Sequence, residues 1–207
     1  MKSLEQSVIY WVYDYDLQMK LDPDLVIFKS LMDSGDIDIV QFRAKGISLD
    51  DYLIWSESLL NKLGETDSIV VANDFCEAVD KLGLDGVHIG QSDMPLQEAR
   101  ELLGDKIIGA TARSFEAADN ANEIADYIGA GTVFQTTTKE GLEPKGPSFI
   151  KEMKERVSIP VFPIGGIDSQ NAVQLVESGI KKAAIASCLL KADDPQKELL
   201  RLCKTLK

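Results

Sequence analysis

The sequence contains few of the residues that build disulfides, thiolate metal sites or histidine clusters. It has three cysteines and a single histidine among 207 residues. Cys76, Cys188 and Cys203 are odd in number and lack metal-ligand spacing, so we interpret them as reduced thiols. No apolar run is long enough to cross a membrane, and the first residues lack an apolar segment with a cleavage site. We therefore expect a cytoplasmic protein with no signal peptide.

Positive charge is also scarce. The chain has 22 lysines and arginines against 34 acidic residues, which gives a net charge of -12. This balance argues against nonspecific binding to nucleic acid or to anionic membranes. It does not exclude a small anionic ligand, because such a ligand responds to the local site. Low-complexity runs are absent and 44% of the residues are hydrophobic, so we expect one globular domain over residues 1–207.

Short apolar runs alternate with amphipathic stretches along the chain. We predict eight strands, at residues 8–13, 37–42, 68–72, 86–89, 106–110, 127–129 with 132–134, 160–164 and 183–186. Helical patterns lie between them. One begins at Ser48, an N-cap with Asp51 at the capping-box position, and ends at Gly64. Another is predicted over residues 168–179.

Eight strands that alternate with helices indicate an α/β fold with a parallel sheet. Eight such units favour closure into a single (β/α)₈ TIM barrel, for which 207 residues is a small size. The rival is an open doubly wound sheet, which would have five or six strands and a glycine-rich turn after the first. The first predicted strand instead ends in "YDYD".

The stretch "QFRAK" places Gln41, Arg43 and Lys45 at alternate positions where the second predicted strand ends. Side chains two residues apart on a strand point the same way. Barrel enzymes carry their chemistry at the C-terminal ends of the strands. The stretch therefore predicts that an amide and two cations converge on that end, although a solvated strand end would have the same pattern.

Other strands also end in polar residues. They are Asn73 and Asp74, then His88 and Asp93, then Thr111 and Arg113, then Thr136, Thr138 and Lys139, then Gly165 and Gly166, and finally Ser187. Arginine and lysine bind phosphate oxygens, and carboxylates with phosphate oxygens form Mg²⁺ sites. The glycine pair before a helix can hold a second phosphate on backbone N–H groups. The residue types thus predict two anionic subsites.

Structural interpretations of the same residues remain open. Asp74 and Asp93 could each cap the helix that follows, and the glycine pair could be ordinary turn chemistry. His88 lies within an apolar strand, where a core histidine is the commoner case. Trp11 and Tyr13 could fill the barrel or form the wall of a pocket. We favour function because these residues share one rim.

In order along the chain, the segments "QFRAK", "VAND", "GVHIGQSDMP", "IGATARS", "ADYIGAGTVFQTTTK", "PIGGI" and "IASCLL" resemble the thiamine-phosphate synthases, also called thiamine-phosphate pyrophosphorylases. The resemblance runs from about residue 8 to residue 190. That family is a (β/α)₈ barrel that joins an aminopyrimidine methyl diphosphate to a thiazole phosphate and releases pyrophosphate.

The resemblance implies roles for individual residues. Gln41 and Asn73 are implied to contact the aminopyrimidine diphosphate. Its diphosphate would be bound, and its departure assisted, by Arg43, Lys45, Thr111 and Lys139. Asp74 and Asp93 would hold Mg²⁺. The thiazole phosphate side is implied to be contacted by Thr136, Thr138, Gly166, Ala186 and Ser187.

The chain departs from the family pattern at three positions. Thr111 stands where serine is usual, and Gln135 replaces a proline. Arg113 replaces a histidine that the related thiazole tautomerases use for proton transfer, and arginine cannot act as that base. The synthase is therefore our first hypothesis, before a tautomerase and a non-catalytic thiamine-precursor binding protein. We expect small-molecule partners, no nucleic acid and no membrane, with a homodimer as one option for the oligomeric state.

Overall fold

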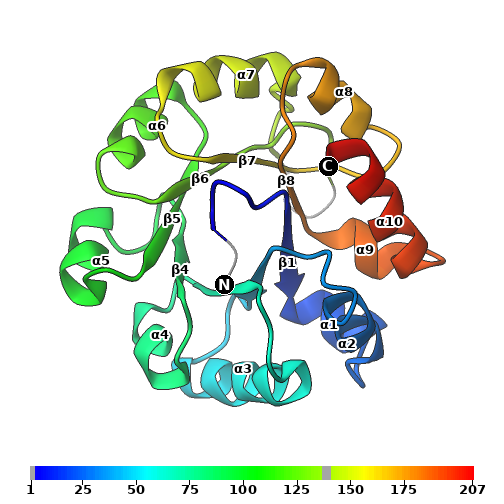
Figure 1. Ribbon diagram of the computed structural model, residues 1–207. Coiled ribbons are helices and arrows are strands. Elements are labelled where there is room, and N and C mark those ends of the chain that lie inside the picture. The colour runs from blue at the N-terminus through cyan, green and yellow to red at the C-terminus, as the bar shows by residue number, and fades with distance from the viewer. Residues whose placement is uncertain (1–2, 137–140) are drawn as a thin grey trace.

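Eight parallel strands close into a barrel in the order of the sequence, as the computed structural model of the chain shows (Figure 1). The structure describes residues 3–136 and 141–207. The strands are β1 Ile9–Asp14, β2 Ile39–Arg43, β3 Ile69–Asn73, β4 Gly86–Ile89, β5 Ile107–Ala112, β6 Tyr127–Gly131, β7 Val161–Ile164 and β8 Ala183–Ile185. Because β8 pairs with β1, no strand edge is left open, and the predicted barrel is confirmed.

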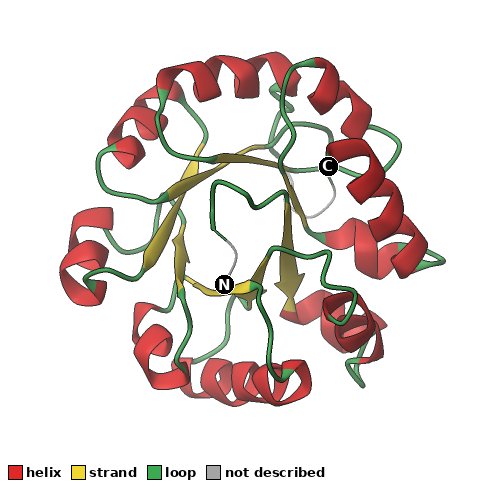
Figure 2. Cartoon of the chain, viewed as in Figure 1, coloured by secondary structure: helices red, strands yellow, loops and turns green. Residues whose placement is uncertain are grey.

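Helices form a ring around the barrel (Figure 2). They are α1 Tyr15–Leu21, α2 Val26–Met32, α3 Leu49–Leu63, α4 Cys76–Leu82, α5 Leu96–Leu103, α6 Phe115–Asn122, α7 Gly146–Arg156, α8 Ala172–Glu177, α9 Ser187–Lys191 and α10 Pro195–Leu206. The predicted cap of α3 is confirmed, because Ser48 Oγ accepts the Asp51 N–H at 3.1 Å. Among the described residues, no helix is long and apolar enough to span a membrane.

Two predicted boundaries are wrong. Residues 132–134 do not continue the sixth strand, because Val133 N–H donates to Ile164 O and the chain turns across the end of β7. The helix predicted over residues 168–179 begins only at Ala172. Asp168 precedes it in a turn, where its carboxylate accepts the Asn171 N–H at 3.0 Å.

Two apolar clusters flank the sheet. One fills the barrel and contains Tyr10, Ile39, Tyr127 and Phe162 with their neighbours, whereas the other lies between the strands and the helices. Trp11 and Tyr13 belong to the outer cluster and pack on Phe28, so the prediction that they fill the barrel or line a pocket is wrong. Alternation along β1 turns Tyr10 and Val12 inward instead.

The N-terminal segment lies across one end of the barrel in the view along its axis (Figure 1). Leu4 packs against the apolar cluster inside the barrel. Lys182 Nζ donates to the carbonyl oxygens of Leu4, Glu5 and Ser7 at 3.1, 2.6 and 2.6 Å. This end is therefore plugged, which leaves the C-terminal ends of the strands for a ligand.

Candidate active site

A cavity of about 710 Å³ opens at the C-terminal ends of the strands. It is lined by every described residue for which the sequence predicted a role: Gln41, Arg43, Lys45, Asn73, Asp74, Asp93, Thr111, Thr136, Gly166, Ala186 and Ser187. Thr138 and Lys139, which carry the remaining predictions, lie outside the described residues. One cavity thus brings together side chains from segments that are far apart in the sequence.

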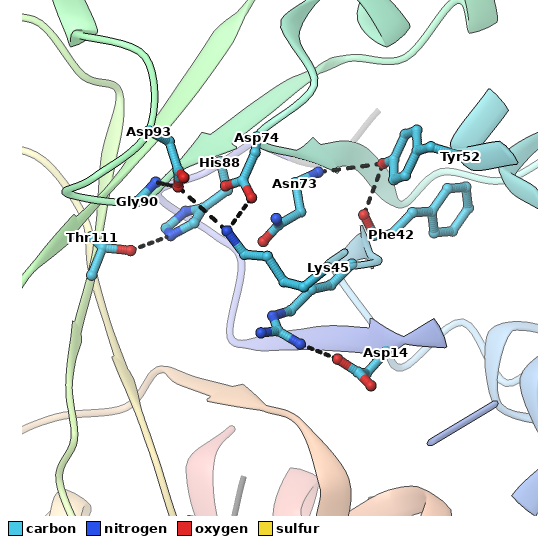
Figure 3. A network of polar contacts seen from close by, with 11 residues as sticks. Asp14, Phe42, Lys45, Tyr52, Asn73, Asp74, His88, Gly90, Asp93 and Thr111 are labelled. Atoms are coloured by element: carbon cyan, nitrogen blue, oxygen red, sulfur yellow. Dashed lines mark hydrogen bonds and ion pairs between the residues drawn. The ribbon is translucent and has the colours of Figure 1, made fainter. Parts of the chain in front are cut away.

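Two carboxylates and an ammonium group meet on one wall of this cavity (Figure 3). Lys45 Nζ forms an ion pair with Asp74 Oδ2 and lies 3.5 Å from Asp93 Oδ2. Asp93 Oδ2 also accepts the Gly90 N–H at 3.0 Å. Neither aspartate caps a helix, because α4 and α5 begin after Phe75 and Pro95 with no side-chain cap. The capping interpretation of both residues is therefore wrong.

The neighbouring carboxyl groups have opposite pKa shifts. Burial raises the pKa of Asp74, and its hydrogen bond with Asp93 raises it further. Burial alone would also raise the pKa of Asp93, but hydrogen bonds from Asp74, Lys45 and the Gly90 amide lower it overall. The surroundings therefore favour the protonated form at Asp74 and the ionised form at Asp93.

Arg43 is neutralised by a residue that the sequence did not single out. Its guanidinium forms an ion pair with Asp14, which lies at the end of β1 and is only 6% exposed. Asp14 also accepts the Leu17 N–H at the start of α1, at 3.2 Å. The stretch "YDYD" carried a signal for this residue, because it placed a carboxylate at a strand end next to strand two.

Amide groups lie deeper in the cavity. Gln41 is buried, and its Nε2 donates to the hydroxyl of Tyr10 at 2.5 Å. Asn73 is also buried, and within the described part of the chain its Nδ2 has no hydrogen-bond partner. Since an unpaired buried donor is costly, Asn73 is suited to a ligand that offers an acceptor.

The predicted glycine pair forms a tight turn on the opposite side. Gly165 and Gly166 have φ of +106° and +65°, a backbone region that favours glycine. A Cβ atom on Gly166 would lie 2.2 Å from Gln135 O, so no larger residue fits. Because α8 begins only at Ala172, any backbone donors here belong to the turn itself and not to that helix.

His88 is not the core histidine that the sequence favoured. It lines the cavity, where its Nε2 lies 2.9 Å from Thr111 Oγ1 (Figure 3). Its Nδ1 lies 3.2 Å from the Tyr127 hydroxyl. Arg113 lines the cavity as well, beside Thr111 on the β5 side.

Comparison with known proteins identifies relatives of this chain. The family model described as thiamine monophosphate synthase matches residues 9–189. A thiamine-phosphate synthase from Clostridium acetobutylicum is 39% identical over 188 residues, which cover 86% of this chain and 89% of that protein. One from Prochlorococcus marinus is 34% identical over 99% of this chain, which spans only 57% of that protein's length.

Solved structures give a similar result. Thiamine phosphate pyrophosphorylase from Pyrococcus furiosus superposes with a TM-score of 0.84 at 29% identity, over 96% of this chain and 95% of that one. A 3-hexulose-6-phosphate synthase from Salmonella typhimurium reaches a TM-score of 0.71 at 16% identity, over 96% and 98% of the two chains. At that identity the second likeness is one of fold alone.

Proposed function

The chain belongs to the thiamine monophosphate synthase family, and from this premise we propose that it makes thiamine phosphate. It would join an aminopyrimidine methyl diphosphate to a thiazole phosphate and release pyrophosphate. The observation that carries this proposal is the single cavity, in which amides, cations, a carboxylate pair and a glycine turn face the same space. Each group has a counterpart in the two substrates.

The cations and carboxylates support a role for Mg²⁺. Among Asp14, Arg43, Lys45, Asp74 and Asp93 there are two positive and three negative side chains, each cation paired with a carboxylate. A diphosphate would therefore meet a net negative cluster unless a divalent cation accompanied it. The described residues contain no group of three or more potential metal ligands. Two carboxylates completed by phosphate and water oxygens suit Mg²⁺.

In this proposal Asp74 and Asp93 would hold Mg²⁺, which would supply positive charge against the departing diphosphate. Arg43 and Lys45 would donate hydrogen bonds to diphosphate oxygens, together with Thr111 and with Lys139, which lies outside the described residues. Negative charge grows on the leaving group in the transition state, so preoriented donors stabilise that state more than the ground state.

The other residues are proposed to orient the reacting groups. Gln41 and Asn73 hold the pyrimidine ring, whose cationic character grows as the diphosphate departs. Gly166, Ala186 and Ser187 hold the thiazole phosphate, with Thr136 and Thr138 beside it. The attacking thiazole nitrogen has a lone pair and no proton to lose, so the step needs no general base. This agrees with a cavity whose histidine has both ring nitrogens beside hydroxyl groups.

Product formation tests the proposal. We expect thiamine phosphate from the two phosphorylated precursors with Mg²⁺, and at least about a hundredfold less when the metal is chelated. The same protein should not exchange protons into the thiazole carboxylate when the pyrimidine is omitted, since Arg113 cannot serve as the base. Exchange without coupling would indicate a tautomerase. Tight ligand binding with neither activity would indicate a precursor-binding protein.

A further inference from the structure

Five polar side chains form one continuous hydrogen-bonded chain through the barrel interior. Gln41 Nε2 lies 2.5 Å from the Tyr10 hydroxyl, and that hydroxyl lies 2.8 Å from the hydroxyl of Tyr127. The Tyr127 hydroxyl lies 3.2 Å from His88 Nδ1, and His88 Nε2 lies 2.9 Å from Thr111 Oγ1. Both ends of this chain, Gln41 and Thr111, line the cavity.

The barrel leaves specific room for the middle of this chain. A Cβ atom on Gly109 would lie 2.0 Å from the Tyr127 ring, and one on Gly129 would lie 2.9 Å from the His88 ring. Tyr10 and Tyr127 are 1% and 0% exposed, and their rings pack edge to face at 5.6 Å. Glycine at these two positions therefore leaves room for the rings of Tyr127 and His88 inside an otherwise filled barrel.

Burial keeps the two tyrosine hydroxyls of this hydrogen-bonded chain protonated. It raises the pKa of Tyr10 and of Tyr127 above the ordinary value for tyrosine, so both hydroxyls stay protonated. A buried hydroxyl that receives one hydrogen bond donates its own proton to the next acceptor in reach. The hydrogen bonds must therefore all run in the same direction from one end to the other.

With a neutral imidazole at His88, which has one donor and one acceptor nitrogen, two directions satisfy every member. In the first, Gln41 Nε2 donates to Tyr10, each tyrosine donates onward, and His88 Nε2–H donates to Thr111. Gln41 Oε1 then faces away from Tyr10, and the Thr111 proton is left to donate into the cavity. In the second direction every hydrogen bond is reversed. The Gln41 amide is then flipped, and the Thr111 hydroxyl donates its proton to His88 Nε2. The contact from Gln41 Nε2 corresponds to the first direction.

We propose that this chain couples the two ends of the cavity, so that an anion bound by Thr111 fixes the orientation of the Gln41 amide. The inference rests on the proposed function, in which Thr111 binds the diphosphate and Gln41 contacts the pyrimidine. An anion accepts hydrogen bonds and requires the Thr111 proton, which selects the first direction. Gln41 then presents an acceptor, Oε1, to the pyrimidine. Tyr10, Tyr127 and His88 are positioning residues in this scheme, because they act through Gln41 and Thr111.

The coupling predicts substrate selectivity. An exocyclic amine donates a hydrogen bond to Gln41 Oε1, whereas the oxo group of the corresponding oxopyrimidine presents a second acceptor. With the chain intact, Gln41 cannot flip to suit the oxo compound without reversing every bond up to the anion. With the chain cut, the amide is free to present either group. Selectivity for the amine should thus depend on Tyr127, which does not face the substrate.

The decisive variant is Tyr127→Phe, with Tyr13→Phe as a matched control. Tyr13 is a buried tyrosine whose hydroxyl donates to Asp22 at 2.9 Å, outside this chain. For each protein, kcat/KM is measured with the aminopyrimidine diphosphate and with its oxo analogue. We expect the ratio of the two values to fall by about tenfold in Tyr127→Phe and to stay within about twofold of wild type in Tyr13→Phe. An unchanged ratio in Tyr127→Phe, or an equal fall in the control, would overturn the proposal.

A measurement on the unmutated protein keeps the test independent of folding and of activity. His88 is the only histidine, so its two ring nitrogens give the only imidazole signals in a ¹⁵N spectrum. With magnesium pyrophosphate bound at about pH 8, where histidine is ordinarily neutral, we expect the proton on Nε2. A proton on Nδ1 would mean that the bonds run the other way and would overturn the proposal.

Failure of the synthase assay leaves this inference testable by calorimetry. Magnesium pyrophosphate should strengthen binding of the free aminopyrimidine alcohol more than that of its oxo analogue, in wild type but not in Tyr127→Phe. Equal strengthening of both alcohols in wild type would remove the coupling. If thiamine phosphate is formed but the coupling is absent, only the inference fails. If the coupling is present without thiamine phosphate, only the proposed function fails.

Discussion

Asp74 combines two unfavourable features at the residue scale. Its backbone has a φ of +64°, which is uncommon for a residue other than glycine. Burial also raises the pKa of its carboxyl group above the ordinary 3.8. Above pH 3.8 an unfolded chain has lost this proton while the folded protein still holds it, so stability falls as the pH rises through the folded pKa. The ionised carboxylate is therefore retained at a cost in stability.

Substitution of the two aspartates should separate function from stability. At pH 7 without metal, we expect Asp74→Asn to have a higher free energy of unfolding than wild type, because the amide keeps the shape and removes the buried charge. Asp74→Asn and Asp93→Ala should each lower Mg²⁺-dependent product formation by about a hundredfold or more. Denaturant titration and an assay on the same samples measure both effects. Normal turnover by folded Asp93→Ala would rule out a role for this carboxylate.

Residues at the cavity could be predicted from the sequence where a strand end carried an unusual polar group. Gln41, Arg43, Asn73 and Asp93 satisfy that condition, and all line the cavity. Tyr10 and Tyr127 could not be found in this way, because period two assigns alternate faces without saying which face lies inside the barrel. Strand β1 carries aromatic side chains on both faces, and only pairing with β2 and β8 determines which of them turn inward.

At the scale of elements, the eight strands could be predicted because each is an apolar run between turn or helix signals. The end of β6 could not, since it depends on contact with another strand. A Cβ atom on Gly131 would lie 2.0 Å from Ile164 O, and the residues after it bond to β7 and to Gly165. Such a contact is absent from the local sequence of either strand. The plug at the N-terminal end of the barrel is likewise a long-range contact, made by Lys182.

We expect Lys182→Met to loosen this plug. The methionine keeps the apolar stem, which lies near the Phe162 ring, but removes the donor for three carbonyl oxygens of residues 4–7. Loss of these hydrogen bonds should lower the free energy of unfolding by about 1–2 kcal/mol. Faster amide exchange should accompany it at residues 4–9. The neighbouring exposed Lys181→Met is the control and should change neither quantity; equal effects in both variants would remove the special role of Lys182.

Burial lowers the pKa of Lys182 from its ordinary 10.5. The folded protein then releases this proton at a lower pH than the unfolded chain, so in the interval below pH 10.5 the wild type gains stability as the pH rises. Lys182→Met lacks this contribution. Between about pH 8 and pH 10, the free energy of unfolding should therefore rise more steeply with pH, or fall less steeply, for wild type than for the variant.

The whole molecule is strongly acidic, yet it is proposed to bind a diphosphate. Its net charge of -12 repels such a ligand at long range, and two of the cations at the cavity, Arg43 and Lys45, are already paired with carboxylates. Both effects oppose an anion that arrives alone and favour one that arrives with Mg²⁺. Binding of pyrophosphate should therefore depend on the metal. Because a ligand that binds only the folded state stabilises it, this dependence should be measurable as a change in the stability of the whole molecule.

Pyrophosphate with Mg²⁺ should raise the melting temperature of the wild type. At a ligand concentration about a hundredfold above Kd, the added stability of about 2.7 kcal/mol corresponds to a shift of about 5–10 °C for a chain of this size. Chelation of the metal should abolish most of the shift. Arg43→Ala should lose much more of this temperature shift than Arg113→Ala, when each variant is compared with its own unliganded value. The substitution of Arg43 removes a cation and leaves the buried carboxylate of Asp14 unpaired, and that negative charge opposes an anion in the cavity. Equal shifts in the two variants would contradict the proposed role of Arg43 in binding the diphosphate, since both arginines line the same cavity.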